Sequence, residues 1–163
     1  VYRAGLLEVG AGIDSGEVFY GNIGSNERMV NTVIGDNVNS ASRLEGLTRF
    51  YKVPVVTSRY VKDEVELETN RYWFVELDRV QVKGKTEGKS IFWPVLRQNV
   101  DDQLEQDLTY FDEGLRSYYE GEWRNAEKAF QSCTLGLSNT FLGRIKNRQA
   151  PQNWNGVWTM KEK

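Results

Sequence analysis

Residues 32–46 read Thr-Val-Ile-Gly-Asp-Asn-Val-Asn-Ser-Ala-Ser-Arg-Leu-Glu-Gly. The apolar start predicts a short strand, and the polar residues after the first glycine predict a turn in which Asp36 or Asn37 caps a helix. Asn39 and Arg43 are four positions apart, so a helix places the amide and the guanidinium on one face, about one turn apart. An uncharged amide beside a forked cation suits a phosphate or a developing negative charge. The stretch therefore predicts a phosphate-facing helix.

A simpler interpretation of the same pair is structural. Asn39 would then serve as a helix cap, and Arg43 would form a surface ion pair, for example with Glu45 or Glu17. Most charged side chains on protein surfaces are only solvated, and exposed ion pairs contribute little to stability. The residues of this stretch leave both interpretations open.

The chain before this stretch is rich in glycine. Residues 5–23 hold two short apolar runs around a Gly/Asp/Ser/Gly break, which predicts a strand, a turn and a strand. The glycines either serve hairpin geometry or allow another backbone or a ligand to approach. The spacing of Gly10, Gly12 and Gly16 does not match the dinucleotide-binding fingerprint, and a strand follows where that fingerprint needs a helix.

The chain after it alternates between strands and a helix. We expect a polar loop at 24–31, then, after the helix, the elements 54–57 (strand), 58–66 (helix), 71–83 (strand) and 90–96 (strand). Lys83 begins a turn rich in glycine and lysine. It is not a P-loop, because Arg79 stands where the first glycine is needed and the turn joins two strands. Lys83 is either a solvated turn lysine or a ligand-binding cation.

Beyond residue 97 the apolar period becomes helical. We therefore divide the chain into residues 1–97 and a helical tail, residues 98–163. Two amphipathic segments separated by Gly121 predict a helical hairpin, and a third helix is expected at 141–148. The spacing of glycine, aromatic and alanine residues in the hairpin resembles one tetratricopeptide repeat. A single repeat cannot bury its own faces, so we expect the tail to dock on the first domain or on a partner.

Composition excludes several functions. The 163 residues are 39% hydrophobic and 27% charged with a net charge of −2, which fits a globular chain without a basic field for nucleic acid. There is no histidine, which excludes Ser-His-Asp hydrolysis and His-ligated zinc. Cys133 is the single cysteine, and no apolar run is long enough to span a bilayer, so a cytoplasmic location is expected. Because the first residue is Val1 and not Met, we expect the chain to begin inside a longer protein.

Several segments together carry a resemblance to a known family. In order they are Gly12-Ile-Asp-Ser-Gly-Glu-Val, Gly21-Asn-Ile-Gly-Ser, residues 32–46, Val53-Pro-Val and Val82-Lys-Gly-Lys. Over residues 5–96 the chain resembles the C-terminal part of a class III adenylate/guanylate cyclase catalytic domain of bacterial type. The resemblance implies an α+β fold of ferredoxin-like type, here without its N-terminal segment and followed by the helical tail.

The resemblance also implies an activity and its residues. It implies an adenylate cyclase for intracellular signalling, which converts ATP to cyclic AMP and pyrophosphate at sites between the two copies of a homodimer. By position, Asn39 and Arg43 match the catalytic residues that hold the ribose and the α-phosphate. Thr32 matches the residue that selects the purine, where guanylate cyclases tend to carry cysteine, and Lys83 matches a lysine that reaches the terminal phosphates.

The resemblance does not cover every part of the family's site. It implies two Mg²⁺ or Mn²⁺ ions, whose aspartate ligands should precede residue 1 together with a regulatory domain. Asp14, Asp36 and Asp78 do not match those ligands, so no metal ligand is assigned within the chain. This chain alone is therefore expected to be inactive. A guanylate cyclase, or a non-catalytic module that uses the cyclase fold for dimerisation or nucleotide sensing, remains an alternative.

Overall fold

The structure, a computed structural model, describes residues 9–25, 27–81 and 88–159. Strands and helices are mixed along the chain, which confirms the predicted α+β class. The elements are β1 (Ala11–Ile13), β2 (Phe19–Ser25), β3 (Arg28–Ile34), α1 (Asp36–Tyr51), β4 (Val55–Ser58), α2 (Arg59–Glu68), β5 (Tyr72–Gln81), β6 (Lys89–Leu96), the short 3₁₀ helix η1 (Arg97–Asn99), α3 (Asp102–Tyr119), α4 (Trp123–Ser132), α5 (Ser138–Ile145) and β7 (Trp158–Thr159).

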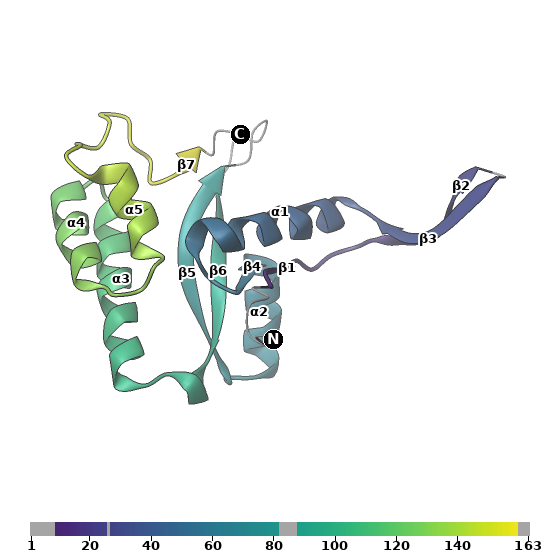
Figure 1. Ribbon diagram of the computed structural model, residues 1–163, viewed down its shortest axis with the longest axis horizontal. Helices are drawn as coiled ribbons and strands as arrows, with labels where there is room; N and C mark the ends of the chain where they lie inside the picture. The colour runs from purple at the N-terminus through teal and green to yellow at the C-terminus, as the bar shows by residue number, and fades with distance from the viewer. Residues whose placement is uncertain (1–8, 26, 82–87, 160–163) are drawn as a thin grey trace, which may run out of the picture.

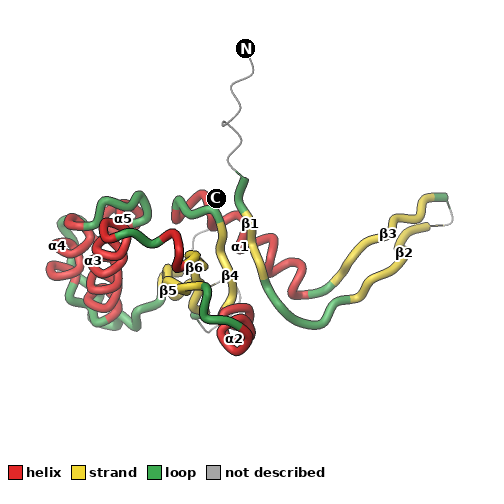
Figure 2. Tube along the Cα trace, turned by 90° about the horizontal axis from the view of Figure 1, so that it is seen from below, coloured by secondary structure: helices red, strands yellow, loops and turns green. Residues whose placement is uncertain are grey.

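A mixed sheet organises the molecule, with the strand order β1-β4-β6-β5-β7. β6 is antiparallel to both β4 and β5, whereas β1 runs parallel to β4 and β7 runs parallel to β5. Figure 2 shows α1 and α2 on opposite sides of this sheet. The helices α3–α5 stand beside β5 at one end of the molecule, and the β2–β3 hairpin points away from the sheet at the other (Figures 1 and 2). None of the helices in the described ranges is long and apolar enough to cross a membrane.

Helix α1 begins at Asp36, which is earlier than a cap at Asp36 or Asn37 would allow. Gly35 occupies the cap position, and the Asn37 side chain donates instead to the backbone carbonyl of Glu17 at 3.1 Å. The prediction that Asp36 or Asn37 caps the helix is therefore wrong. The helix ends at Tyr51 because Lys52 adopts a left-handed conformation (φ 56°) and Pro54 follows.

The glycines of β1 allow α1 to pack closely on the strand. A Cβ atom on Gly12 would lie 2.1 Å from the carbonyl oxygen of Ala41 and 2.2 Å from the backbone nitrogen of Glu45. No side chain fits in that space, so this glycine is needed for close approach of a second backbone. Between the two interpretations of the glycines, Gly12 thus supports close approach, with α1 as the approaching element.

The strands β2 and β3 form a hairpin, and both are longer than the strands predicted here. Its strands pair from Phe19 with Ile34 to Ser25 with Arg28, so residues 24–25 and 28–31 belong to strands and the expected polar loop over 24–31 is wrong in those parts. The polar sequence misled the prediction because both strands are exposed to solvent, where polar side chains keep their hydrogen bonds to water. The backbones still pair across the hairpin and form strands. Large apolar side chains are also exposed here, with Phe19 at 83% and Tyr20 at 73%.

The tail shares one hydrophobic core with the sheet. Its buried aromatic residues Phe111, Tyr118, Phe130 and Phe141 belong to the same cluster as residues of α1, β4, β5 and β6. α3 starts at Asp102 with a hydrogen bond from the Leu104 backbone N–H to the Asp101 carboxylate. The predicted helical hairpin and third helix are present as α3, α4 and α5. The division at residue 97 and the similarity to a tetratricopeptide repeat stay predictions.

Candidate functional site

Helix α1 carries both predicted catalytic residues. Asn39 lies in its first turn and Arg43 one turn later, about 6 Å further along the helix axis, and both are exposed. The other face of the helix holds the buried residues Leu44, Thr48 and Tyr51, which fix the helix against the sheet and the tail. The packing of one face therefore leaves the amide and the guanidinium directed outwards and available to a ligand.

The surface ion pair that we considered for Arg43 is absent among the described residues. The carboxylate of Glu45 pairs with Arg49 instead, at 3.7 Å on the same helix. No hydrogen bond from Asn39 or Arg43 to another side chain is found within residues 9–25, 27–81 and 88–159. Exposed polar side chains on a helix need no protein partner, so this arrangement fits solvated side chains as well as a ligand-binding pair.

The structure places Thr32 on β3, where it pairs with Gly21 of β2 and is half-buried. β3 leads through Gly35 directly into α1, so Thr32 lies immediately before the helix that carries Asn39 and Arg43. No contact between Thr32 and these residues is recorded in the part of the chain that the structure describes. Lys83 lies outside the described residues, two positions after the end of β5. The roles of all four residues stay predictions.

Metal binding depends on the donor groups that the structure contains. Across the described ranges, no group of three or more His, Cys, Asp or Glu side chains is arranged to hold a metal ion. Asp78 is fully buried and accepts hydrogen bonds from Tyr51 and Arg144, so it is occupied by protein partners. The acidic side chains of the described ranges therefore do not fit a site for two metal ions.

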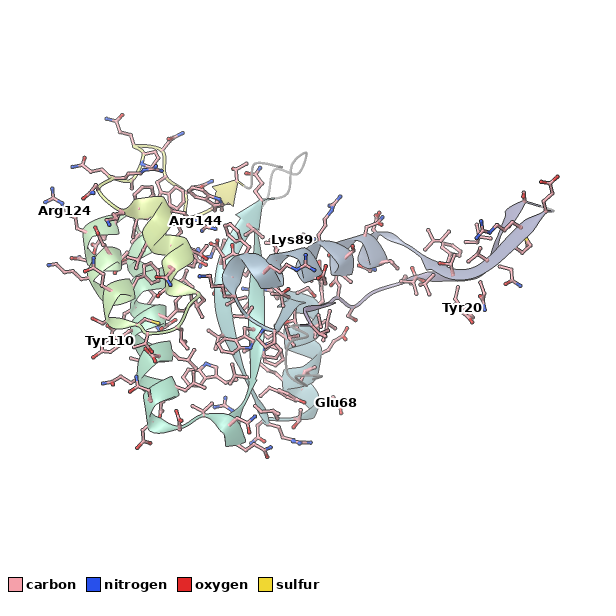
Figure 3. All side chains as sticks on the ribbon, viewed as in Figure 1. Tyr20, Glu68, Lys89, Tyr110, Arg124 and Arg144 are labelled. Carbon is pink, nitrogen blue, oxygen red and sulfur yellow. The ribbon has the colours of Figure 1, made fainter. Side chains whose placement is uncertain are left out.

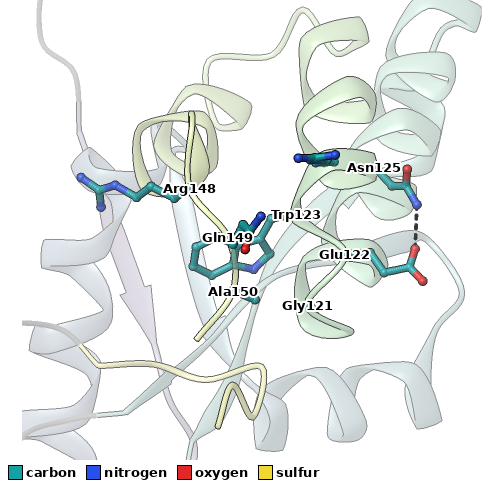
Figure 4. A pocket seen from close by; sticks show the side chains of 8 residues that line it. Gly121, Glu122, Trp123, Asn125, Arg148, Gln149 and Ala150 are labelled. Atoms are coloured by element: carbon teal, nitrogen blue, oxygen red, sulfur yellow. Dashed lines mark hydrogen bonds between the residues drawn. The ribbon is translucent and has the colours of Figure 1, made fainter. Parts of the chain in front are cut away.

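Two cavities lie away from α1. One, of about 460 Å³, is lined by residues of the tail between Gly121 and Asn125 and between Arg148 and Ala150 (Figure 4). The other, of about 590 Å³, has a mainly apolar lining that includes Val61, Phe74 and Trp93. Neither cavity includes Thr32, Asn39 or Arg43 in its lining.

Sequence reasoning missed a buried polar cluster that connects α1 to the tail. Asp78 accepts hydrogen bonds from Tyr51 and from Arg144, each at 2.6 Å, and Arg144 also donates to the Tyr51 hydroxyl at 3.1 Å. A signal was present, because Arg144 is three residues after Phe141 and next to Ile145, both buried, so it lies on the inner face of α5. Figure 3 labels Arg144 where α5 faces the sheet.

Burial shapes the protonation of this cluster. Burial, and then the charge of Asp78, raise the pKa of Tyr51 well above its ordinary value, so the hydroxyl keeps its proton and serves as a donor. Burial also raises the pKa of Asp78, while the charge of Arg144 and the hydrogen bond from Tyr51 act in the opposite direction. The three side chains therefore depend on one another for their charge state.

The known proteins that this chain resembles belong to one family. Over 140 residues the chain is 28% identical to a terminal-differentiation specific adenylate cyclase of Dictyostelium discoideum, a match that covers 85% of this chain and 7% of that protein. It is 38% identical over 86 residues to an adenylate cyclase of Anabaena cylindrica, covering 53% of this chain and 17% of the relative. The chain thus spans less than a fifth of the length of these two relatives.

A solved structure and a family model complete the comparison. The adenylyl cyclase CyaB from P. aeruginosa is 26% identical with a TM-score of 0.44, covering 55% of this chain and 44% of that one. The model of the adenylate and guanylate cyclase catalytic domain matches residues 3–96, more than half of the 163 residues. The chain therefore belongs to the adenylate and guanylate cyclase catalytic domain family.

Proposed function

We propose that this chain is part of an adenylate cyclase, which converts ATP to cyclic AMP and pyrophosphate. The observation that carries the proposal is the exposed pair Asn39 and Arg43 on α1, inside the segment that matches the cyclase family. Glu45, the candidate acidic partner on the same helix, pairs with Arg49 and leaves the guanidinium of Arg43 for a ligand. The relatives named above are adenylate cyclases, which supports ATP as the substrate.

In the proposed reaction the 3′-hydroxyl of the ribose loses its proton to water, and its oxygen bonds to the α-phosphorus. The bond from that phosphorus to the bridging oxygen breaks, and pyrophosphate leaves. Asn39 holds the ribose, and Arg43 forks two oxygens of the α-phosphate, where negative charge develops in the transition state. Thr32 contacts the purine, and Lys83 reaches the terminal phosphates.

Divalent ions belong to the proposal as cofactors, but the described residues do not form a site that would bind them. Mg²⁺ or Mn²⁺ would neutralise phosphate charge, and we propose that aspartates upstream of residue 1 in the complete protein bind two such ions. The residues of this chain would then supply the metal-free half of the site, which binds the base, the ribose and the α-phosphate.

We propose further that two copies of the domain pair, with active sites between them. The projecting β2–β3 hairpin supports this, because Phe19 and Tyr20 expose apolar rings that a second copy would cover. The proposal includes a cytoplasmic location, where ATP is available, and a regulatory domain before the catalytic one. The tail would be a single repeat-like unit that docks on the catalytic domain, and its core shared with the sheet supports this.

The test is an assay of the complete protein, as its gene encodes it, with ATP or GTP and with Mg²⁺ or Mn²⁺. We expect cyclic AMP to form only when a divalent ion is present, and kcat/KM to be higher for ATP than for GTP. A preference for GTP would identify a guanylate cyclase. Nucleotide binding without any cyclic product would instead favour a non-catalytic sensing or dimerisation module.

A further inference from the structure

The tail holds the C-terminal end of the helix that carries the predicted catalytic residues. Tyr51, the last residue of α1, is fully buried, and its hydroxyl joins Asp78 of β5 to Arg144 of α5. Arg144 also donates to the Tyr118 hydroxyl of α3 at 3.4 Å. One buried guanidinium thus connects α1, β5, α3 and α5.

A second contact acts on the same end of α1. The Thr140 hydroxyl of α5 donates to the backbone carbonyl of Phe50 at 2.8 Å. The last carbonyls of a helix lack partners within the helix and carry partial negative charge. The tail therefore supplies a hydrogen-bond donor and a nearby cation at the end of α1 where both are favourable.

The strand β7 brings the tail to the end of β5, the last described strand before Lys83 in the sequence. Trp158 pairs with Val80 and Thr159 pairs with Gln81 at the end of β5, which precedes Lys83 by two residues. The Trp158 ring lies 4.4 Å from the guanidinium carbon of Arg144. Arg144 thus contacts both Tyr51 of α1 and Trp158 of β7.

Helix α1 can transmit a displacement from this end to the predicted site. Eight residues separate Arg43 from Tyr51, which is about 12 Å along a helix. A tilt of about 5° at the buried end would move the Arg43 backbone by about 1 Å. A misplacement of about 1 Å in a positioning group can lower a rate about 100-fold.

We propose that Arg144 is a positioning residue, which fixes α1 through Tyr51 and Asp78 and so sets the place of Arg43 at the α-phosphate. The inference rests on the proposed cyclase function. It gives the tail a role in the reaction, although no tail residue needs to touch the nucleotide.

The test uses two variants of the complete protein that change the connection without emptying the core. Tyr51→Phe removes the hydroxyl that links α1 to the pair Asp78–Arg144 but keeps the ring. Arg144→Lys keeps a positive charge beside Asp78 but lacks the fork that also reaches Tyr51. We expect kcat to fall about tenfold in each, with KM for ATP changed less than twofold, because a displaced Arg43 stabilises the transition state less but binds ATP about equally well.

Two controls separate positioning from stability. Arg124→Lys makes the same substitution at an exposed arginine of α4 and should leave kcat unchanged. Leu108→Ala removes a buried side chain of α3, about 15 Å along the helix from Tyr118. It should lower the melting temperature but leave kcat at 25 °C within twofold of wild type.

Hydrogen exchange gives a readout that does not depend on turnover. Amide exchange in residues 36–47 should become faster in Tyr51→Phe and stay unchanged in Leu108→Ala. Unchanged kcat and unchanged exchange in Tyr51→Phe would overturn the positioning role, as would an equal loss of kcat in Leu108→Ala. A wild-type protein without cyclase activity would overturn the proposed function itself.

Discussion

Tyr51 and Arg144 lie 93 residues apart in the chain, yet the guanidinium of Arg144 donates to the Tyr51 hydroxyl at 3.1 Å in the protein interior. Both donate to the same oxygen of Asp78, Oδ2, at 2.6 Å. The side chains of Arg144 and Asp78 are 4% and 0% exposed, so this is a buried ion pair and not a surface contact. Removing one partner leaves the other charge buried without compensation.

We predict that Arg144→Met lowers the free energy of unfolding by about 3–5 kcal/mol, because Asp78 then lies uncompensated in the core. Urea unfolding followed by circular dichroism measures this. Arg124→Met, at an exposed position of α4, should change the value by less than about 0.5 kcal/mol. A decrease of less than about 1 kcal/mol in Arg144→Met would show that the pair is not buried as described.

A second prediction concerns acid stability and Asp107 of α3. Burial acts to raise the pKa of Asp107, but hydrogen bonds from the Thr134 backbone and hydroxyl and from Gln103 outweigh it, so the pKa is lowered. A carboxyl with a lowered pKa in the folded state stabilises the protein above its unfolded-state pKa, and this contribution is lost as the pH falls through the folded-state pKa. The wild type should therefore lose this contribution below about pH 4.

Asp107→Asn tests that contribution. The variant should be less stable at pH 7 by about 1–3 kcal/mol, since an amide accepts the Thr134 hydrogen bonds less strongly. Its unfolding free energy should also fall less steeply than that of the wild type between about pH 5 and pH 3. Urea titrations at several pH values measure both effects, and parallel pH profiles for the two proteins would contradict the assignment.

Regular hydrophobic patterns predicted most of the elements. The alternation around Trp73, Val75 and Leu77 predicted β5, and the helical period of Leu108, Phe111 and Leu115 predicted α3. The start of β3 and the cap of α1 were predicted wrongly, because backbone pairing with β2 holds the polar residues 28–31 in a strand and because Asn37 contacts Glu17, 20 positions earlier in the chain. Local propensity contains no information about such contacts.

A third prediction concerns the choice of purine. Thr32→Cys should lower the ratio of kcat/KM for ATP to that for GTP about tenfold, because the side chain at this position is proposed to contact the base. Thr109→Cys makes the same substitution at an exposed position of α3 and should leave the ratio unchanged. An unchanged ratio in Thr32→Cys would remove this residue from the proposed site.

A fourth prediction concerns the β2–β3 hairpin. Replacing Phe19 and Tyr20 by serine should shift the protein from dimer to monomer and lower activity, because the exposed rings are proposed to pack on a second copy. Sedimentation velocity measures the shift. Leu67→Ser removes an apolar side chain of α2 that is 87% exposed and should leave the dimer intact. A double variant that stays dimeric would place the interface elsewhere.

The candidate site was predicted less completely than the fold. The spacing of Asn39 and Arg43 predicted that both lie on one face of a helix, and the structure shows them exposed on α1. The connection from Tyr51 through Asp78 to Arg144 was not predicted, because an arginine in an apolar helix and an aspartate in an apolar strand show their pairing only after the chain has folded. Their contact depends on how the tail returns to the sheet.

The central claim is that Arg43 stabilises charge on the α-phosphate during cyclisation of ATP. The most direct measurement is kcat for cyclic AMP formation by the complete protein carrying Arg43→Ala, beside Arg49→Ala as a control on the same helix. Arg49 is also exposed and pairs with Glu45 at the surface. We predict that Arg43→Ala lowers kcat about 100- to 1,000-fold without a change in melting temperature, while Arg49→Ala retains wild-type turnover. Equal turnover in both variants would contradict the account.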